Sequence, residues 1–281
     1  MREITVAEIT DQVARMCVEA NICLGEDVIK ALRCSVELEE SPIGKGVLQS
    51  LIENERISRC ERIPVCQDTG FAVFFIEWGQ ELHLTGGTLE EAVNEGVRRG
   101  YREGYLRKSI VDDPLYNRKN TGDNTPAVIY TAIVSGDRLK ISFAPKGGGS
   151  ENMSAVKMLK PFDGEKGIID FVVDQVRSAG PNPCPPIVVG VGIGGTFDKV
   201  AVLAKKALFR PLGRPHPDPV FAALEQKILG EINKLGIGPQ GFGGRVTALA
   251  VHIETFPSHI VSLAAAVNIN CHVSRHLERV L

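Results

Sequence analysis

Apolar side chains in the first forty residues recur at the spacing of helices that bury one face. One such stripe runs from Ile9 to Ala20, and a second follows Asp27, a residue type that favours helix N-termini. A third helix is expected at Pro42, because proline at the first helical position lacks only an N–H that would have no partner there. The predicted apolar positions are Ile9, Val13, Met16, Cys17 and Ala20 in the first helix, and Val28, Ile29, Leu32 and Val36 in the second.

The middle of the chain changes to the short apolar runs that are typical of strands. Residues 71–76 form one such run. Residues 127–134 and 139–144 look like the arms of a β-hairpin that is closed by a four-residue turn at 135–138. The pattern therefore predicts a strand followed, later in the chain, by a hairpin.

Two helices are expected among these strands. Thr88 and Glu91 have the spacing of a capping box, which predicts a helix that begins there and runs to about Gly104. A second helix is expected to begin near Glu151, after a glycine-rich loop.

In the second half of the chain, helical and strand-like segments alternate. Hairpins and irregular glycine loops are too frequent for a regular parallel βαβ series, so we predict an α+β fold with mixed helices and largely antiparallel sheets. Residues 1–281 are expected to form one domain, with a candidate subdomain boundary near 180–187. The predicted helices are at about 165–178, 198–208 and 220–235, and the apolar strand-like segments at 187–191, 245–253 and 260–269.

Charge and hydropathy exclude several classes of protein. The 32 Lys and Arg residues nearly balance the 34 Asp and Glu residues, so there is no long-range field for binding nucleic acid or an anionic membrane. The polar N-terminus does not resemble a secretory signal. The most apolar stretch, 246–273, is interrupted by His252, Glu254, Pro257 and His259 before it reaches membrane-spanning length. We therefore expect a cytoplasmic protein.

Seven scattered cysteines predict reduced thiols and argue against a secreted disulfide framework. Three of them, Cys17, Cys23 and Cys34, fall within or beside predicted helices and are expected to be small buried hydrophobic residues.

Cys66, Cys184 and Cys271 differ, because each lies in a loop at the end of a predicted element. Prolines on both sides of Cys184 restrain its backbone, as suits a metal ligand. Three thiolates would leave one iron of a [4Fe–4S] cluster without a protein ligand, and that iron could act as a Lewis acid. Spacing alone leaves alternatives open: Cys60 could replace Cys66, and Cys271 could bind zinc with His272 and His276.

Two glycine-rich loops could bind anions. Gly190, Gly192 and Gly195 imitate a dinucleotide-binding loop, but the proline-rich segment 214–219 stands where the second strand of such a unit should end. Tight packing of a strand against a helix is the favoured interpretation. The loop 146–150 could present backbone N–H groups to a carboxylate, although a flexible turn is the alternative.

Four motifs in the same order resemble the N-terminal region of class I fumarases and the α subunit of L-tartrate dehydratase. The resemblance runs from about residue 5 to the C-terminus. It implies that Cys66, Cys184 and Cys271 hold a [4Fe–4S] cluster whose fourth iron binds substrate. The motifs are Cys66-Gln67-Asp68-Thr69-Gly70, Lys146-Gly147-Gly148-Gly149-Ser150-Glu151-Asn152, Asn182-Pro183-Cys184-Pro185-Pro186 and Asn270-Cys271-His272.

The same resemblance implies substrate contacts at Gln67, Asp68, Arg107, Gly148 and His259. Arginine can bind a carboxylate through two hydrogen bonds, and Asp68 or His259 could orient the leaving hydroxyl or transfer its proton as catalytic residues. Taken singly, Arg107 could equally be a surface charge, and His259 a polar residue with only structural partners.

Single-chain members of the family continue into a second domain that supplies further catalytic residues. The resemblance therefore implies a separate β subunit, an α2β2 or similar assembly and a small dicarboxylate substrate. The expected activity is the reversible hydration of fumarate to malate. The alternatives are tartrate dehydration, a non-catalytic metal-binding scaffold subunit and a nucleotide-dependent oxidoreductase.

Overall fold

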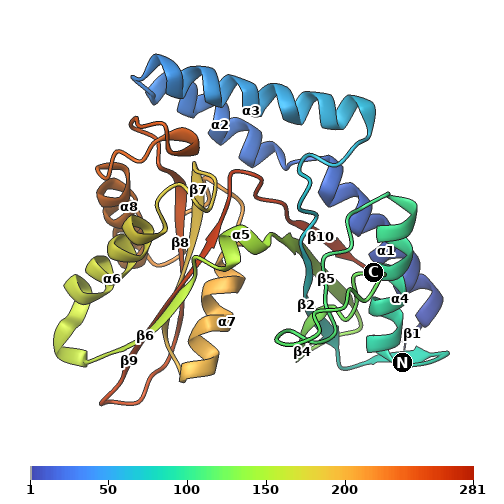
Figure 1. The fold of residues 1–281 in the computed structure, drawn as a ribbon. Coiled ribbons are helices and arrows are strands. Elements are labelled where there is room, and N and C mark those ends of the chain that lie inside the picture. Colours follow the sequence, from blue (N-terminus) through green and yellow to red (C-terminus); the bar gives the residue numbers. More distant parts are fainter. Residues whose placement is uncertain (1) are drawn as a thin grey trace. The chain divides into compact units, whose positions relative to one another are not determined.

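The computed structural model describes residues 2–281, and the chain divides into two units (Figure 1). Of the described residues, unit 1 comprises 2–25, 55–148 and 275–281, and unit 2 comprises 26–54 and 149–274. Each unit is thus built from separate stretches of the chain, and the segment 180–187 lies inside unit 2. The mixture of helices and mixed sheets confirms the predicted α+β class.

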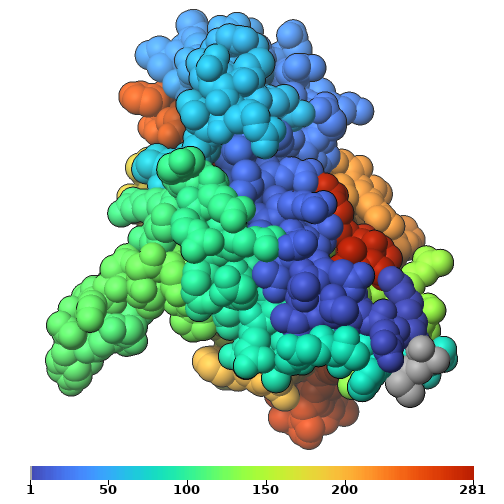
Figure 2. Space-filling model, turned by 90° about the vertical axis from the view of Figure 1, so that its right-hand side faces the viewer, coloured from blue at the N-terminus to red at the C-terminus, as the bar shows by residue number. Residues whose placement is uncertain are grey.

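Unit 1 contains a four-stranded mixed sheet in the order β10-β5-β2-β4 and a parallel pair, β1-β3. Helices α1 and α4 pack together, and Figure 2 shows them side by side in blue and teal. The elements are β1 (Arg2–Thr5), α1 (Val6–Ile22), β2 (Phe71–Gly79), β3 (Leu82–Thr85), α4 (Leu89–Glu103), β4 (Val128–Val134), β5 (Leu139–Lys146) and β10 (Leu277–Val280), together with the C-terminal part of α3 (Pro42–Glu61).

The predicted hairpin is wrong, although both of its strands exist. β2 lies between β4 and β5, parallel to β4 and antiparallel to β5. Alternating apolar positions identify a strand but do not say which strand pairs with it. Here β2, which stands much earlier in the chain, forms a ladder with each of the two strands and so replaces the single ladder between them that the hairpin would have made.

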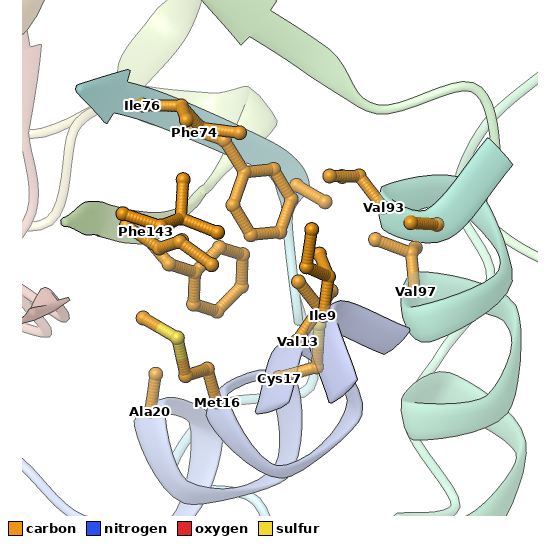
Figure 3. Packing of buried hydrophobic residues seen from close by; sticks show 14 of the residues in the cluster. Ile9, Val13, Met16, Cys17, Ala20, Phe74, Ile76, Val93, Val97 and Phe143 are labelled. Carbon is orange, nitrogen blue, oxygen red and sulfur yellow. The ribbon is translucent and has the colours of Figure 1, made fainter. Parts of the chain in front are cut away.

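The core of unit 1 lies between its sheet and the pair of helices (Figure 3). Phe74 of β2 stacks on Phe143 of β5 with ring centroids 4.8 Å apart, and the apolar stripe of α1 covers them. Burial of large apolar side chains stabilises such a core by about 1.5–3 kcal/mol for each one. The predicted stripe of the first helix is confirmed, since Ile9, Val13, Met16, Cys17 and Ala20 are all buried.

Both long helices of unit 1 begin with a capping box. In α4 the Glu91 N–H donates to the Thr88 hydroxyl, and the Thr88 N–H donates to the Glu91 carboxylate. The predicted start is confirmed, and Thr5 and Glu8 repeat the arrangement at α1. These reciprocal bonds satisfy N–H groups that a helix N-terminus leaves unpaired.

Unit 2 contains a second mixed sheet, in the order β6-β9-β7-β8. β7 is parallel to β8 and antiparallel to β9. Its elements are α2 (Glu26–Leu38), the N-terminal part of α3, α5 (Gly148–Glu151, whose first residue belongs to unit 1), β6 (Ala155–Leu159), the 3-10 helix η1 (Pro161–Asp163), α6 (Gly164–Ala179), β7 (Ile187–Gly194), α7 (Phe197–Ala207), α8 (Pro219–Asn233), η2 (Pro239–Gly241), β8 (Ala248–Phe256) and β9 (Leu263–Asn270).

Helices cover both faces of this sheet, with α6 and α8 on one face and α7 on the other (Figure 1). Gly190 and Gly192 of β7 lie directly under α7. A Cβ atom at Gly190 would lie 2.1 Å from the Ala204 carbonyl oxygen, and one at Gly192 would lie 2.2 Å from that of Val200. The glycine pattern therefore serves close packing of strand and helix, as predicted.

Two local predictions fail. Cys34 is exposed, because it lies off the buried stripe of α2, which contains Val28, Ile29 and Leu32. The helix expected to begin near Glu151 is instead the single turn α5, which ends at that residue. Cys17 is buried as predicted, and Cys23 is partly buried. No helix in the described part of the chain combines the length and apolar character needed to cross a bilayer.

Candidate functional site

Three of the predicted site residues of unit 1 lie on the loop that leads into β2. This loop, residues 65–70, carries Cys66, Gln67 and Asp68. The thiol sulfur of Cys66 accepts a hydrogen bond from the Asp68 N–H at 3.4 Å, and Cys66 is partly exposed. Backbone N–H groups directed at sulfur stabilise negative charge on a thiolate ligand.

Asp68 is held by two backbone N–H groups. Its Oδ1 accepts from Gly70 at 3.0 Å, and its Oδ2 accepts from Gly148 at 2.8 Å. The Gly148 amide, which was expected to meet substrate, thus contacts Asp68 in this structure. This bond brings the 146–148 segment of the glycine loop against the Cys66 loop.

Gly70 makes that approach possible. Its φ of 72° lies in the left-handed region, and a Cβ atom there would lie 2.8 Å from backbone atoms of Pro145 and Lys146. Only glycine allows both the turn and this close contact.

Arg107 is joined to the same loop through its backbone. The Thr69 hydroxyl donates to the Arg107 carbonyl oxygen at 2.8 Å, and Asn124 bridges the Ser109 N–H and the Gly70 carbonyl. The Arg107 side chain is exposed, and within residues 2–281 no hydrogen bond or ion pair occupies its guanidinium. A guanidinium in this state can bind a carboxylate through two N–H groups.

Tyr101 supports the loop from the core of unit 1. Its hydroxyl donates to the carbonyl oxygens of Thr69 and Gly70, at 2.6 and 3.1 Å. Burial raises the pKa of Tyr101, so the phenol stays protonated and remains a donor. The Thr69 and Gly70 carbonyl groups thus receive a hydrogen bond from the protein and do not need one from water.

The other two predicted ligands, Cys184 and Cys271, lie at one end of the unit 2 sheet. Cys184 precedes β7 and Cys271 follows β9, and the pairing of Val188 with Asn270 brings those ends together. His272 Nδ1 lies 3.0 Å from the Cys184 carbonyl oxygen, so the tautomer protonated at Nδ1 can donate there. The two cysteine-bearing segments are therefore in direct contact.

Cys184 has a backbone conformation that few residues other than glycine adopt. Its φ is 55°, and its N–H donates to the Pro181 carbonyl oxygen at 2.9 Å. Gln240 donates from its backbone and its side chain to the Pro185 carbonyl oxygen. Strain of this kind, about 1–3 kcal/mol, persists where the surroundings enforce it and is common at functional sites.

His259 lies at the opposite end of the unit 2 sheet. It is exposed in the segment between the end of β8 and the start of β9, whereas Cys271 follows the other end of β9. A strand of eight residues is about 24 Å long. Within unit 2, His259 is therefore not brought together with Cys184 and Cys271.

The three predicted ligands are divided between the units, with Cys66 in unit 1 and the other two in unit 2. Among the described residues, no group of three or more His, Cys, Asp and Glu side chains forms a ready-made metal site. The ligand set stays a prediction, and so does the alternative zinc site at Cys271, His272 and His276.

The amino-acid sequence matches a known protein family. The family model described as Fumarate hydratase (Fumerase) matches residues 10–280, nearly the whole chain. The chain belongs to the fumarate hydratase (Fumerase) family.

Two curated relatives of this family member cover most of its length. A Methanocaldococcus jannaschii protein named "Putative L(+)-tartrate dehydratase subunit alpha" is 44% identical over 273 residues, which are 95% of each chain. The protein of Escherichia coli K12 named "L(+)-tartrate dehydratase subunit alpha" is 33% identical over 272 residues, which are 96% of this chain and 89% of the relative. The similarity is thus not confined to the motifs.

Several residues that organise the site of this fumarate hydratase family member were missed in the sequence. Tyr101, Asn124 and Arg275 all bind carbonyl groups of the Cys66 loop. In the sequence, the only indication of a role for Tyr101 is its hydroxyl group, which stands on the apolar stripe of the helix that became α4. Asn124 and Arg275 lie in irregular segments, where sequence spacing carries no information about distant partners.

Proposed function

We propose that this chain is the cluster-bearing α subunit of a hydro-lyase that reversibly hydrates fumarate to malate. The observation that carries the proposal is the joining of three predicted substrate-contact segments in unit 1. Asp68 binds Gly148, and Thr69 binds the Arg107 carbonyl, so one hydrogen-bonded group carries a carboxylate, an exposed guanidinium and a cysteine thiol. Family membership supports hydration chemistry.

Cys66, Cys184 and Cys271 would hold a [4Fe–4S] cluster. The donor set fits, because Cys66 accepts an N–H group at sulfur and the other two lie in contacting, restrained segments. Cys17, in contrast, is fully buried, and burial raises the pKa of its thiol, which opposes thiolate formation. When bound, such a cluster supplies an iron without a protein ligand, a Lewis acid for the hydroxyl and carboxylate of the substrate.

The residues of the chain would hold and orient the substrate. Arg107 would bind a carboxylate through two N–H groups, and Gln67, which is exposed beside Cys66, would donate a further hydrogen bond. Asp68, fixed by the N–H groups of Gly70 and Gly148, would orient the leaving hydroxyl or transfer its proton. Within one copy of this chain, His259 lies far from Cys184 and Cys271, so the proposal gives its side chain no role.

A partner subunit would complete the site. Both relatives above are named as alpha subunits, which supports a separate β subunit. We propose an α2β2 or similar assembly of the two. A base on that partner would remove the C3 proton of malate. The proposed activity therefore belongs to the assembly and not to this chain alone.

L(+)-tartrate is the second candidate substrate, and the names of the relatives favour it. Tartrate differs from malate by one additional hydroxyl group. The residues proposed here bind groups that both molecules share, so a direct comparison of the two substrates is required.

The proposal can be tested by anaerobic purification with the co-expressed partner subunit. Iron and sulfide content would be measured first, followed by hydration of fumarate and dehydration of malate and L(+)-tartrate. Cys184→Ser should abolish the cluster and turnover while the protein remains folded. Cys34→Ser is the matched control, because Cys34 is also exposed but lies on α2, outside the proposed ligand set.

The outcomes separate the candidate functions. Full activity in Cys184→Ser would refute the ligand assignment. A stable cluster without turnover of any dicarboxylate would indicate a scaffold subunit. Turnover of tartrate but not of fumarate or malate would show that tartrate is the substrate.

A further inference from the structure

Arg275 is a buried cation whose binding partners are neutral groups of the site. Its side chain is 3% exposed. Nη1 donates to the Asn21 side-chain oxygen at 2.8 Å, and Nη2 donates to the Asp68 carbonyl oxygen at 2.9 Å. Within residues 2–281, no carboxylate pairs with Arg275, and its Nε has no hydrogen-bond partner.

Asn21 supports the other end of the same loop. It is fully buried in the last turn of α1, where its side-chain nitrogen donates to the Cys17 carbonyl oxygen at 2.8 Å. Its own carbonyl oxygen accepts the Val65 N–H at 2.9 Å. The Asn21–Arg275 pair thus binds the Cys66 loop at two points, the N–H of Val65 and the carbonyl of Asp68, with Cys66 and Gln67 between them.

This arrangement is a costly means of stabilising a fold. Removing a guanidinium from water carries a large penalty, which an opposite charge or a full set of hydrogen bonds normally offsets. Arg275 has neither within the described residues. What it does provide is a fixed direction for the Asp68 peptide group, since the planar guanidinium holds two partners in one geometry.

We propose that Arg275, supported by Asn21, is a positioning residue that presets the Cys66 loop for cluster and substrate binding. This inference rests on the proposed function. Arg275 would act through Asp68 and Cys66, by fixing the backbone on which the Asp68 carboxylate and the Cys66 thiol stand. Lysine keeps the positive charge but lacks the second arm, so it could not bind Asn21 and Asp68 with the same geometry.

The test compares Arg275→Lys with Arg279→Lys in the full chain, co-purified anaerobically with its partner subunit. Arg279 is a matched control, because it lies on the same C-terminal segment but forms a partly exposed ion pair with Glu19. The first measurement is amide hydrogen exchange in the cluster-free protein. Peptides covering residues 64–70 should exchange at least about tenfold faster in Arg275→Lys, with the rest of unit 1 unchanged.

The second measurement is made after cluster reconstitution. Arg275→Lys should lower kcat by about tenfold to a hundredfold, as expected for a misplaced catalytic group, with a smaller change in KM and an altered electron paramagnetic resonance spectrum of the reduced cluster. Arg279→Lys should match the wild type in every respect.

Three results would overturn the inference. Exchange at 64–70 could be unchanged, protection could fall uniformly across unit 1, or kcat and the spectrum could match those of the wild type. A uniform fall would mark Arg275 as an ordinary core residue. Failure of the wild-type protein to bind a cluster would instead contradict the proposed function, which keeps the two failures distinguishable.

Discussion

The Gly148 N–H donates a 2.8 Å hydrogen bond to Oδ2 of Asp68, and this bond joins two motifs that lie eighty residues apart. The second Asp68 oxygen accepts from Gly70, so both oxygens of the carboxylate have a backbone donor. A carboxylate held in this way has a fixed orientation before substrate arrives. Such pre-organisation is what proton transfer or hydroxyl orientation requires.

Asp68→Asn should therefore lower kcat by about a hundredfold or more, the usual contribution of a positioned acid or base. An amide can accept at only one position, and its NH₂ group would face one of the two backbone donors. Cluster content should remain near the wild-type level, because Asp68 is not a proposed ligand. The measurement is steady-state kinetics together with iron analysis, and Asp137→Asn on the exposed β4–β5 turn is the control. Unchanged kcat in Asp68→Asn would remove Asp68 from the mechanism.

Tyr101→Phe should destabilise unit 1, since its hydroxyl serves two buried carbonyl oxygens in the Cys66 loop. Leaving such acceptors without a donor costs about 1–3 kcal/mol. Urea denaturation would measure the loss. Tyr105→Phe is a matched control, because Tyr105 is 90% exposed and should not change the denaturation midpoint. Equal midpoints for the two variants would show that water replaces the lost donor.

The sequence predicted those parts of the fold that depend on neighbours along the chain. The capping box of α4 and the apolar stripe of α1 need only residues within one or two turns, and both predictions are confirmed. The error at Cys34 was avoidable, because it stands two residues after Leu32, off the stripe that Val28 and Leu32 define.

Other features depend on contacts between distant segments. The hairpin prediction failed because β2 takes the place between β4 and β5. The proposed ligand and substrate residues came from resemblance and stay predictions. The groups that hold the Cys66 loop, Tyr101, Asn124 and Arg275, come from three separate segments, so no local pattern could reveal that they meet there.

Glu39 gives unit 2 a stability that depends on pH. Its buried carboxylate accepts from the backbone N–H groups of Glu40, Ser41, Arg245 and Val246. Burial opposes ionisation of Glu39, but these four donors outweigh it and hold the pKa of the carboxyl below its ordinary value of 4.5. A lowered folded-state pKa means that this stabilisation is fully present above the unfolded-state pKa and is lost as pH falls through the folded-state pKa.

Glu39→Gln should therefore lower the free energy of unfolding at pH 7 by about 2 kcal/mol, as expected for hydrogen bonds to a charged group. The difference from the wild type should shrink as the pH falls below 4.5 toward the lowered folded-state pKa of Glu39, because the wild-type carboxylate then takes up a proton. Denaturant titrations at pH 7, 5 and 3.5 would measure it. Glu40→Gln is the control, because Glu40 is well exposed and pairs with the exposed Arg245 side chain. A difference that stays constant with pH would contradict the assigned role of Glu39.

The glycines of β7 provide a prediction about packing. A Cβ atom at Gly192 would lie 2.2 Å from the Val200 carbonyl oxygen and 2.9 Å from the Ala204 N, both in the backbone of α7, which cannot yield as a side chain can. Gly192→Ala should therefore destabilise the protein by about 3 kcal/mol, the upper range for overpacking. Gly230 lies in the interior of α8, where a Cβ atom would meet nothing within 4 Å. Gly230→Ala should stabilise by up to about 1 kcal/mol through helix propensity. Denaturant unfolding of the two variants would measure effects of opposite sign, and a Gly192→Ala variant as stable as the wild type would show that α7 can move away from β7.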